Sequence, residues 1–356
     1  MTNCQGNQTD QEHGQSIWIS GHLYYHQGLD LVIQGFVRPL VVSLVTGSVI
    51  DAFFFIRDYL GGPHVRLRLR AKAGFADRTA ASMHQHARHF LAIVPSTQSL
   101  SEAAIRRTNE YILASDLHET EDSAYPDNSF WLKPFHPEIE RYGGPENFQR
   151  SIDFFVVSSV SALDFLRQES LNSRSAQITQ AFLLLLQQTL GFAADEPELV
   201  DLLRYGVDSW GQAHPRIVQK ADTIFKSKTD AFCQLFDQGL SEVRSLAPES
   251  AWFDRSSRYL VAGATRLSVA ISTADRITRV RIGGSQLHMT ASRLGLTNAE
   301  EVYLSRLLTL TTVEAFAQNK ELRPWIRNRD VKRSADDPRM AIQSLLPAAL
   351  AQLEGF

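Results

Sequence analysis

Cysteine is scarce in this chain: only Cys4 and Cys233 occur among 356 residues. The two lie far apart, and Cys4 falls in a polar N-terminal segment, so we predict neither a disulfide framework nor a cysteine-rich zinc site. A strong charge of one sign is also lacking, since the formal net charge is −3. Proteins whose main partner is nucleic acid are normally basic, and direct nucleic-acid binding is therefore not expected.

Long hydrophobic runs and targeting signals are missing as well. The densest apolar run, residues 181–192, is interrupted by glutamines and is too short to span a bilayer. The first 15 residues are polar and acidic, and they resemble neither a signal peptide nor a transit peptide. We therefore expect a soluble, cytoplasmic protein with no membrane partner.

Common cofactor and metal motifs are absent from the sequence. It contains no phosphate-binding GxxxxGK(S/T) loop, no GxGxxG after a strand, no HExxH and no GxSxG. His84, His86 and His89 fall on a predicted helix, but their spacing does not bring all three side chains to one metal ion. We expect these histidines to lie on a solvated helix face, and we expect neither a metal nor an organic cofactor.

The pattern of apolar residues changes along the chain from mixed to helical. Residues 1–16 are polar and predict a disordered tail, and residues 17–356 are expected to form a single domain. Within it, residues 17–145 predict a mixed part, with a β-hairpin sheet packed on helices, and residues 146–356 are mainly helical. This order indicates the α+β class. Residues 104–119 are predicted to be strand or extended.

The strand after the Gly61-Gly62 turn carries three arginines at alternate positions, Arg66, Arg68 and Arg70. Alternate side chains of a strand share one face, so the guanidinium groups should lie together. An exposed strand face, with arginine present for solubility, is one interpretation. The other is recognition of a carboxylate or an enolate, because each guanidinium offers a planar fork of donors.

Two further stretches contain candidate site residues. Glu138 and Arg141 stand three residues apart before a Tyr-Gly-Gly sequence, which is compatible with an ordinary ion pair at a helix start or with a functional site. His288 lies in a predicted helix, where a lone histidine is more often a core residue than a functional one. Taken singly, neither stretch decides the function.

Four stretches occur in one order along the chain: SIWISGHLYYH (16–26), FFFIRDYLGGPHVRLRLR (53–70), PEIERYGG (137–144) and LHMTASRLGL (287–296). Together they resemble the C-terminal domain of LanB-type lantibiotic dehydratases, which also occurs free-standing in thiopeptide-type bacteriocin biosynthesis. The resemblance covers about residues 16–350. The large glutamylation domain of full-length dehydratases is expected to be absent, since 356 residues leave no room for it.

The resemblance implies an enzyme that modifies a ribosomally made precursor peptide. In that family, Ser or Thr side chains esterified with glutamate lose the glutamate by β-elimination, which leaves dehydroalanine or dehydrobutyrine. A free-standing relative, the pyridine synthase of thiopeptide pathways, instead joins two dehydroalanines in a formal (4+2) cycloaddition and releases the leader peptide. Elimination is the first hypothesis, pyridine formation is the alternative, and a non-catalytic leader-peptide-binding scaffold is the second alternative. The implied partners are the precursor peptide, with its leader and core, and a separate glutamylating protein.

The resemblance also implies site residues, motif by motif. The implied catalytic residues are Arg66, Arg68, Glu138, Arg141 and His288. The implied peptide-binding residues are His64, Arg70, Trp131, Phe135, Tyr142 and Arg293. Two positions depart from the family, because Phe135 stands where tyrosine is frequent and Ser292 stands where asparagine often precedes the late arginine.

The chemistry agrees with these residue types. Removing a proton from the carbon next to an amide carbonyl builds negative charge on the carbonyl oxygen, and the loss of one donor that stabilises such a charge typically costs about 3–4 kcal/mol. An arginine suits the departing glutamate, and an imidazole suits the proton transfer. Pyridine formation would need an aromatic-lined cleft, for which Tyr125, Phe130 and Trp131 are candidates. We expect the strand arginines, Arg141 and His288 to surround one bound peptide.

Overall fold

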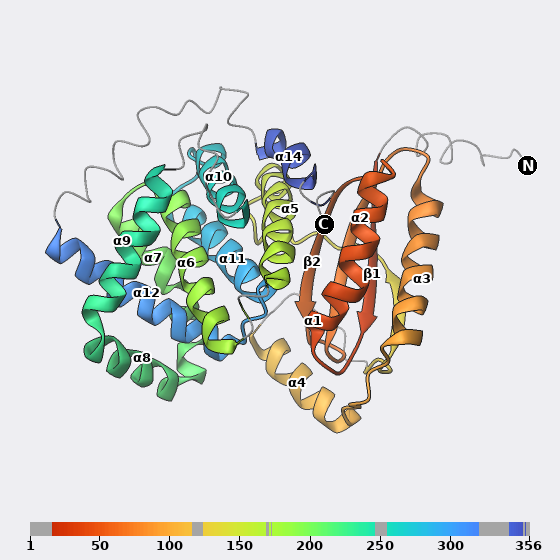
Figure 1. The fold of residues 1–356 in the computed structure, drawn as a ribbon, viewed down its shortest axis with the longest axis horizontal. Helices are drawn as coiled ribbons and strands as arrows, with labels where there is room; N and C mark the ends of the chain where they lie inside the picture. Colours follow the sequence, from red (N-terminus) through yellow and green to blue (C-terminus); the bar gives the residue numbers. More distant parts are fainter. Residues whose placement is uncertain are drawn as a thin grey trace, which may run out of the picture. The chain divides into compact units, whose positions relative to one another are not determined.

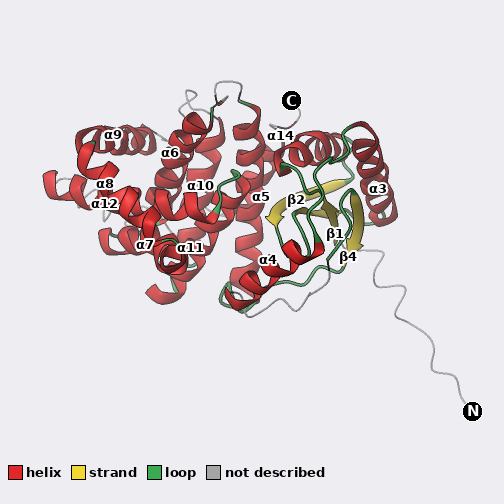
Figure 2. Ribbon diagram, turned by 90° about the horizontal axis from the view of Figure 1, so that it is seen from below, coloured by secondary structure: helices red, strands yellow, loops and turns green. Residues whose placement is uncertain are grey.

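The computed structural model describes residues 16–115, 124–168, 171, 173–245, 255–319, 342–351 and 353. Apart from Ser16, the predicted disordered tail lies outside these residues. The chain divides into two compact units: unit 1 is Met1–Pro137 with Gln352–Phe356, and unit 2 is Glu138–Ala351. The strands lie in unit 1, and unit 2 is helical, which confirms the α+β class (Figures 1 and 2).

Unit 1 is built on an antiparallel sheet with the strand order β2-β3-β1-β4. Its strands are β1 (Ile17–Tyr24), β2 (Ile50–Asp58), β3 (His64–Ala71) and β4 (Ser129–Lys133). The β2–β3 pair is the predicted hairpin. Strand β4 was not predicted, because its five residues lie in a segment rich in proline, glycine and aromatic residues.

The β2–β3 hairpin turns on two glycines and one carboxylate. Gly61 and Gly62 have positive φ angles of 79° and 113°, which residues with a side chain rarely adopt. The Asp58 carboxylate accepts a hydrogen bond at 2.8 Å from the amide of Leu60. This turn fixes the register in which Asp58 lies opposite His64.

Helices cover the apolar face of the sheet. α1 (Leu29–Val32), the π-helical segment η2 (Ile33–Val37) and α2 (Arg38–Thr46) continue as one helix, and α3 (Ala76–Ile93) lies beside it (Figure 1). A Cβ atom at Gly21 of β1 would lie 2.6 Å from the Met83 side chain, so the glycine lets α3 approach the strand closely. Pro39 has no N–H to donate, and the helix takes the wider π form just before it.

Among the described residues, the helix Leu29–Thr46 is long and apolar enough by length and composition to cross a membrane. This finding corrects the expectation that the chain has no such segment. Its side chains Val32, Ile33, Phe36 and Val37 are fully buried in unit 1, as in the core helix of a globular domain.

α4 (Glu102–Ser115) is a helix, which corrects the prediction of a strand or extended segment for residues 104–115. The rest of that predicted segment, residues 116–119, lies outside the described residues. Ile105 and Asn109 stand four residues apart and are both buried, so they share one helical face. Glu102 and Arg106 form an ion pair at 2.6 Å with the same spacing on the exposed side. The segment therefore follows the helical period, although its apolar residues also fit a strand.

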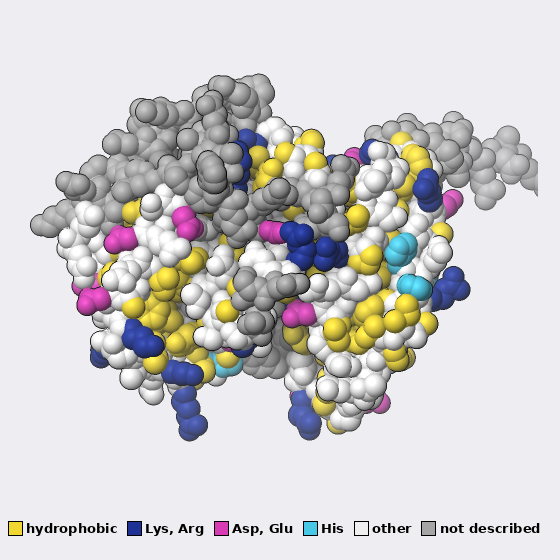
Figure 3. Space-filling model, viewed as in Figure 1, with side chains coloured by type: hydrophobic (Ala, Val, Ile, Leu, Met, Phe, Trp, Pro, Cys, Tyr) yellow, Lys and Arg dark blue, Asp and Glu magenta, His cyan; other side chains and the backbone are white. Residues whose placement is uncertain are grey.

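The histidines of α3 lie where the sequence predicts. His84 and His89 are exposed and His86 is half-buried, and Figure 3 shows histidine side chains at the surface of unit 1. In the part of the chain that the structure describes, no group of three or more His, Cys, Asp or Glu side chains is arranged to hold a metal ion.

Unit 2 is helical, as predicted for the second half of the chain. Its helices are α5 (Pro145–Arg167), α6 (Arg174–Phe192), α7 (Glu196–Trp210), α8 (Pro215–Ser227), α9 (Thr229–Ser245), α10 (Arg255–Ala270), α11 (Arg276–Arg293), α12 (Asn298–Gln318) and α14 (Leu346–Ala351), with the short 3-10 helices η4 (Gly211–Ala213) and η6 (Ile342–Leu345). Residues 151–165 of α5 and 181–192 of α6 are buried on all sides, which places these helices at the centre of unit 2.

Side-chain caps begin the helices that carry candidate residues. Asp195 and Asp275 accept backbone N–H bonds at the starts of α7 and α11. At the start of α12, Thr297 and Glu300 form a capping box. These caps fix where the three helices begin, and thereby which side chains further along each helix face a neighbour.

Glycines let α7, α11 and α12 pack closely. A Cβ atom at Gly284 of α11 would lie 2.2 Å from the Tyr205 ring of α7. One at Gly206 of α7 would lie 2.4 Å from Ser305 Oγ of α12. Both distances are shorter than normal contacts, so a side chain at either glycine would force its neighbour to move.

Gly284→Ala is expected to destabilise the folded protein by about 1–3 kcal/mol, because the added methyl group has to displace the Tyr205 ring. Urea unfolding followed by circular dichroism measures this loss. Gly28→Ala is the matched control, since a Cβ atom at that position meets nothing within 4 Å. Equal stabilities of the two variants would show that α7 and α11 do not pack in this way.

Candidate active site

One face of the sheet in unit 1 carries polar side chains, in contrast to the apolar face under the helices. The register pairs His22 with Arg66 and Ser20 with Arg68 across β1 and β3. It also pairs Ser20 with Lys133 of β4. Side chains at these positions share one face because strand residues alternate. We call this set the polar sheet face, and it consists of Ser20, His22, Tyr24, His64, Arg66, Arg68 and Lys133.

Asp58 and His64 hold Arg66 from two sides. The guanidinium lies 2.9 Å from Asp58 Oδ2, and its Nε donates to His64 Nε2 at 3.1 Å. His64 Nδ1 lies 2.8 Å from the Gly62 carbonyl oxygen, which can only accept, so Nδ1 carries the ring proton. Arg66 is only 9% exposed and Arg68 only 7%, so this strip is not a solvated strand face.

Burial keeps His64 neutral. It lowers the pKa of His64 to about 4, although the Asp58 carboxylate acts in the opposite direction. Burial also disfavours the charged form of Asp58, but the Arg66 guanidinium and the backbone N–H groups of Leu60 and Tyr59 act together to hold the pKa of Asp58 below its ordinary value. At neutral pH the result is a charged Arg66–Asp58 pair with an uncharged imidazole as the second acceptor.

Aromatic rings surround Arg68. Its guanidinium carbon lies 4.6 Å from the centre of the Phe135 ring and 5.3 Å from that of Phe54. The Trp18 ring packs beside both, with centres 6.0 Å from Phe135 and 5.3 Å from Phe54. The face of a ring makes this contact without a phenol, which gives a physical reason why phenylalanine suffices at position 135.

A stack of rings continues the polar sheet face. His64 stacks on Tyr24 and Tyr24 stacks on Tyr125, with ring centres 4.4 Å apart in both pairs. Lys133 Nζ donates to Tyr24 Oη at 3.0 Å and lies 3.7 Å from the centre of the Tyr125 ring. These contacts hold the Lys133 ammonium group over the rings at the β4 side of the face.

The remaining predicted peptide-binding residues of unit 1 lie at its margins. Arg70 forms an ion pair with Asp51 at 2.6 Å and is half-buried. Trp131 is 46% exposed, and its ring contacts Tyr125 edge-on with centres 5.9 Å apart. Strand β4 is at an end of the strand order, so Trp131 offers an exposed apolar surface at the edge of the sheet.

In unit 2, Arg141 connects the segment before α5 to α11 directly and, through Ser285, to α7. Its Nη1 donates to Glu138 Oε2 at 2.9 Å, and its Nε donates to Ser285 Oγ of α11 at 3.3 Å. Tyr205 Oη of α7 lies 3.4 Å from the same Ser285 oxygen. Burial works against the charge of Arg141, but Tyr142 and Glu138 hold its pKa above the ordinary arginine value. The Glu138–Arg141 contact is therefore more than an ion pair at a helix start.

His288 lies three residues beyond Ser285, on the same side of α11. Its Nδ1 is 2.8 Å from Glu301 Oε2 of α12, and its ring packs against Trp210 with centres 5.6 Å apart. A carboxylate at this distance makes Nδ1 the proton-bearing nitrogen of a neutral ring and leaves the Nε2 lone pair for other contacts.

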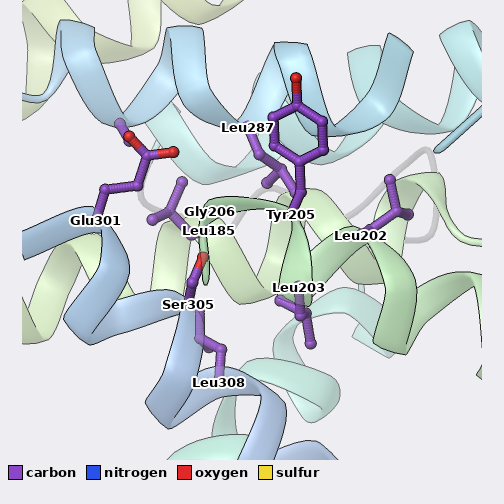
Figure 4. Close-up of a pocket in the computed structure, with 10 residues that line it drawn as sticks. Leu185, Leu202, Leu203, Tyr205, Gly206, Leu287, Glu301, Ser305 and Leu308 are labelled. Atoms are coloured by element: carbon purple, nitrogen blue, oxygen red, sulfur yellow. The ribbon is translucent and has the colours of Figure 1, made fainter. Parts of the chain in front are cut away.

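A small pocket lies beside this pair, among α6, α7, α11 and α12 (Figure 4). Its lining is mainly apolar and consists of Leu185, Leu202, Leu203, Tyr205, Gly206, Leu287, Ala291, Glu301, Ser305 and Leu308. Figure 4 shows the Tyr205 ring standing above the leucines with its hydroxyl group directed away from them. Because Tyr205 contacts Ser285 and Glu301 contacts His288, the pocket joins the surroundings of Arg141 and His288 within unit 2.

Tyr142 and Arg293 lie in the core of unit 2. Tyr142 packs against Phe148 and Phe155 with ring centres 5.8 Å and 5.4 Å away, and its burial raises its pKa. Arg293 is 0% exposed and donates to Ser158 Oγ at 3.1 Å. Both side chains thus pack α5 against its neighbours, and their expected contact with a peptide stays a prediction.

The predicted residues therefore fall into two clusters, one in each unit. His64, Arg66 and Arg68 share the polar sheet face of unit 1, with Phe135 stacked on Arg68. Glu138 and Arg141 are paired in unit 2, and Arg141 contacts the face of α11 that also carries His288. The catalytic and binding roles of all these residues stay predictions.

Several residues of both clusters were not predicted. They are Ser20, His22, Tyr24, Asp58 and Lys133 in unit 1, and Tyr205, Trp210, Ser285 and Glu301 in unit 2. In unit 1, Ser20, His22 and Tyr24 stand at alternate positions of β1, and this pattern could have placed these three side chains on one face of the strand. The second group has no local signal, because separate helices contribute its members.

A family model described as "Lantibiotic biosynthesis dehydratase C-term" matches residues 18–312. No curated protein matches the chain. Among solved structures, the pyridine synthase TbtD from thiomuracin biosynthesis has a TM-score of 0.70 at 16% identity, covering 85% of this chain and 99% of that one. TsrL has a TM-score of 0.57 at 15% identity, covering 90% of this chain and 100% of that one.

The tRNA-dependent lantibiotic dehydratase MibB from Microbispora sp. 107891 has a TM-score of 0.54 at 18% identity. The match covers 88% of this chain but only 29% of MibB, so it spans less than a third of that protein. At these identities, the similarity of the solved structures establishes the fold.

The buried neutral His64 is expected to make the protein less stable as the pH falls. Its pKa is lowered from 6.5 to about 4, so the unfolded chain binds the extra proton between these values. Stability is fully present above pH 6.5, declines as the pH falls towards 4, and this one group accounts for roughly 3 kcal/mol. Urea unfolding of the wild type and His64→Gln at several pH values measures the slope, which should be shallower in the variant. The exposed His89→Gln serves as control, and parallel slopes for all three proteins would contradict the assignment.

Proposed function

Because the chain belongs to the family of lantibiotic biosynthesis dehydratase C-terminal domains, we propose that it eliminates glutamate from glutamylated Ser or Thr residues of a precursor peptide. Membership in this family gives the chain a role in the maturation of ribosomally made peptides. The products of the proposed reaction are dehydroalanine from Ser and dehydrobutyrine from Thr. The observation that carries the proposal is the contact between Arg141 and Ser285 of α11, on the side of that helix that also carries His288.

Arg141 suits the stabilisation of the charge that forms first. When a base removes the α-proton, negative charge develops on the adjacent carbonyl oxygen, and a fixed cationic donor lowers the energy of that state. Glu138 and Ser285 hold the guanidinium, so little reorganisation is needed at the moment of reaction. Its raised pKa keeps it charged throughout.

His288 suits the proton transfer. Glu301 fixes the proton of the neutral ring on Nδ1, and Nε2 is then available to accept a proton. In the elimination, the Cα–H electron pair forms the Cα=Cβ double bond, the Cβ–O bond breaks, and glutamate leaves as a carboxylate. Glu301 also stabilises the imidazolium ion that forms when Nε2 takes the proton.

The strand arginines suit the leaving group. Arg66 and Arg68 are buried cations, and a guanidinium binds a carboxylate through two parallel hydrogen bonds. The proposed steps use only these arginines, Arg141 and His288 with its carboxylate partner, and the proposal includes no metal and no organic cofactor. The proposed partners are the precursor peptide and a separate protein that glutamylates it, and the proposed location is the cytoplasm.

A second candidate is pyridine formation from two dehydroalanines. It is supported by the similarity to TbtD, of which the match covers 99%, and by the absence of a phenol at Phe135. The exposed Trp131 beside Tyr125 offers an aromatic surface for a folded peptide. A non-catalytic leader-peptide scaffold is less well supported, because it has no use for a carboxylate-oriented imidazole such as His288.

Arg141→Ala is expected to slow glutamate elimination about 100- to 1000-fold, because it removes a fixed cationic donor. His288→Ala is expected to slow it by at least about 100-fold, because it removes the proton-transfer group. Mass spectrometry of a glutamylated precursor peptide measures both rates as the loss of glutamate. Arg204→Ala is the control, since Arg204 forms an exposed ion pair with Asp208 at 3.5 Å on α7. Elimination no faster than in buffer by the wild type would refute the proposal.

If pyridine formation is the activity, incubation with a bis-dehydroalanine peptide should release an intact leader peptide. Mass spectrometry of the same mixture should find a core peptide lighter by the leader and one water. Glutamylated peptide should remain unchanged under these conditions. An unchanged bis-dehydroalanine peptide would exclude this candidate.

A further inference from the structure

Strand β4 leaves one edge of the sheet in unit 1 without a partner strand. It is the last strand in the order β2-β3-β1-β4, and among the described residues it pairs only with β1 (Figure 2). In an antiparallel strand, the N–H and C=O groups of every second residue point away from the partner, so those of β4 point outward along this edge. Such a row of groups is a template to which another extended chain can add.

The side chains of β4 do not protect this edge. Trp131 is 46% exposed and Leu132 is 40% exposed, and the alternation of a strand puts them on opposite faces of the sheet. The strand contains no proline, and its one charged residue, Lys133, lies at its end over the Tyr125 ring. Edge strands are normally protected by charge, by proline or by a covering element, so two exposed apolar side chains here indicate a binding surface.

Helix α3 flanks β4 on the face that carries Leu132. The His84 ring meets the ring of Phe130 in β4 edge-on, with ring centres 5.0 Å apart. Arg88 stands one helical turn beyond His84, so it lies on the same side of α3. We call Trp131, Leu132, His84 and Arg88 the β4 edge surface.

The charge of this surface favours an acidic partner. Arg88 is exposed and forms no ion pair or hydrogen bond within the part of the chain that the structure describes. A guanidinium binds a carboxylate through two parallel hydrogen bonds. β4 contains no acidic residue, and α3 contains none beyond Asp77 in its first turn. A second copy of this chain would therefore bring a further Arg88 to the edge but no carboxylate for it.

We propose that an extended, acidic peptide adds to β4 as a fifth strand of the sheet, with carboxylates towards Arg88 and apolar side chains towards Trp131. Successive side chains of an added strand point to opposite faces, as these two contacts require. Hydrogen bonds to the β4 backbone supply affinity, and the alternate side chains supply specificity. That this peptide is a segment of the precursor rests on the proposed function.

Binding of a synthetic peptide to the full-length protein tests the surface without any reaction. The probe is a fluorescein-labelled peptide of alternating valine and glutamate, compared by fluorescence anisotropy with one of alternating valine and lysine. Arg88→Glu should weaken binding of the glutamate peptide at least about tenfold and strengthen binding of the lysine peptide. Arg107→Glu, at an exposed position of α4, is the matched control and should bind like the wild type.

Thermal unfolding checks that both variants are folded. A wild type that binds the glutamate peptide no more tightly than the lysine peptide would overturn the proposal, and so would equal losses of binding in the two variants.

N-methylation of the peptide tests whether its backbone pairs with β4. In an added strand, only every second residue points its N–H towards β4, and those residues share one face. Methylating the valine nitrogens in one peptide and the glutamate nitrogens in another should therefore abolish binding of one and spare the other. Equal affinities of the two methylated peptides would overturn strand addition.

Sedimentation velocity tests the other occupant, a second copy of this chain. A wild type that is monomeric at the concentrations of the binding assay supports a peptide as the occupant. A wild-type dimer that Leu132→Lys converts to monomers would show that β4 pairs with another copy, and would overturn the proposal.

The outcomes also separate this surface from the proposed function. With a glutamylated precursor, Arg88→Glu should raise KM at least about tenfold more than it changes kcat, because Arg88 contacts none of the reacting groups. Peptide binding that depends on Arg88, in a protein that does not eliminate, supports the surface and refutes the elimination. Elimination by a protein whose peptide binding is unchanged in Arg88→Glu overturns the surface and leaves the elimination standing.

Discussion

The hydrogen bond from a buried guanidinium to a neutral imidazole is the interaction on which the polar sheet face depends. Arg66 carries a full charge into a nearly closed environment, which is costly unless the charge is paired and hydrogen-bonded. Asp58 supplies the counter-charge, and His64 supplies a second acceptor. Protonation would turn His64 Nε2 from an acceptor into a donor facing Arg66. The burial that lowers the pKa of His64 is therefore a condition for the arrangement of the whole face.

Unit 2 fixes its arginine by a different means. Arg141 is held by the Glu138 carboxylate and by the Ser285 hydroxyl of α11, which in turn lies 3.4 Å from the Tyr205 hydroxyl of α7. Those hydroxyls meet only because Gly284 lets the Tyr205 ring approach the backbone of α11. In the sheet, the pairing of the strand backbones sets the spacing of the charged groups. In the helices, this spacing depends on Gly284, which has no side chain to keep α7 away. Both solutions leave a guanidinium with little freedom, as electrostatic stabilisation of a developing charge requires.

The sequence predicts best what depends on neighbours along the chain. The β2–β3 hairpin follows from an alternating pattern around two glycines, and the shared face of Arg66 and Arg68 follows from that alternation. Strand β4 was missed because its pairing with β1 joins residues more than 100 positions apart. His22 occurs in a quoted motif, but only the pairing of β1 with β3 places it beside Arg66. Glu301 could not be predicted as the partner of His288, because it reaches that ring through the packing of α11 on α12.

The departures from the family motif can be judged by what the side chains contact. Phe135 presents its ring face to Arg68, and a hydroxyl at the ring edge would add nothing to that contact. The loss of the phenol therefore does not remove the means of holding Arg68. The residues that the proposed elimination uses to handle charge, namely Arg141 with Glu138 and His288 with Glu301, form hydrogen bonds within each pair. A protein that only gripped a leader peptide would gain affinity from exposed apolar surface and free backbone, and would have no reason to bury and orient such groups. The paired charged residues are therefore stronger support for the elimination than the phenylalanine at position 135 is against it.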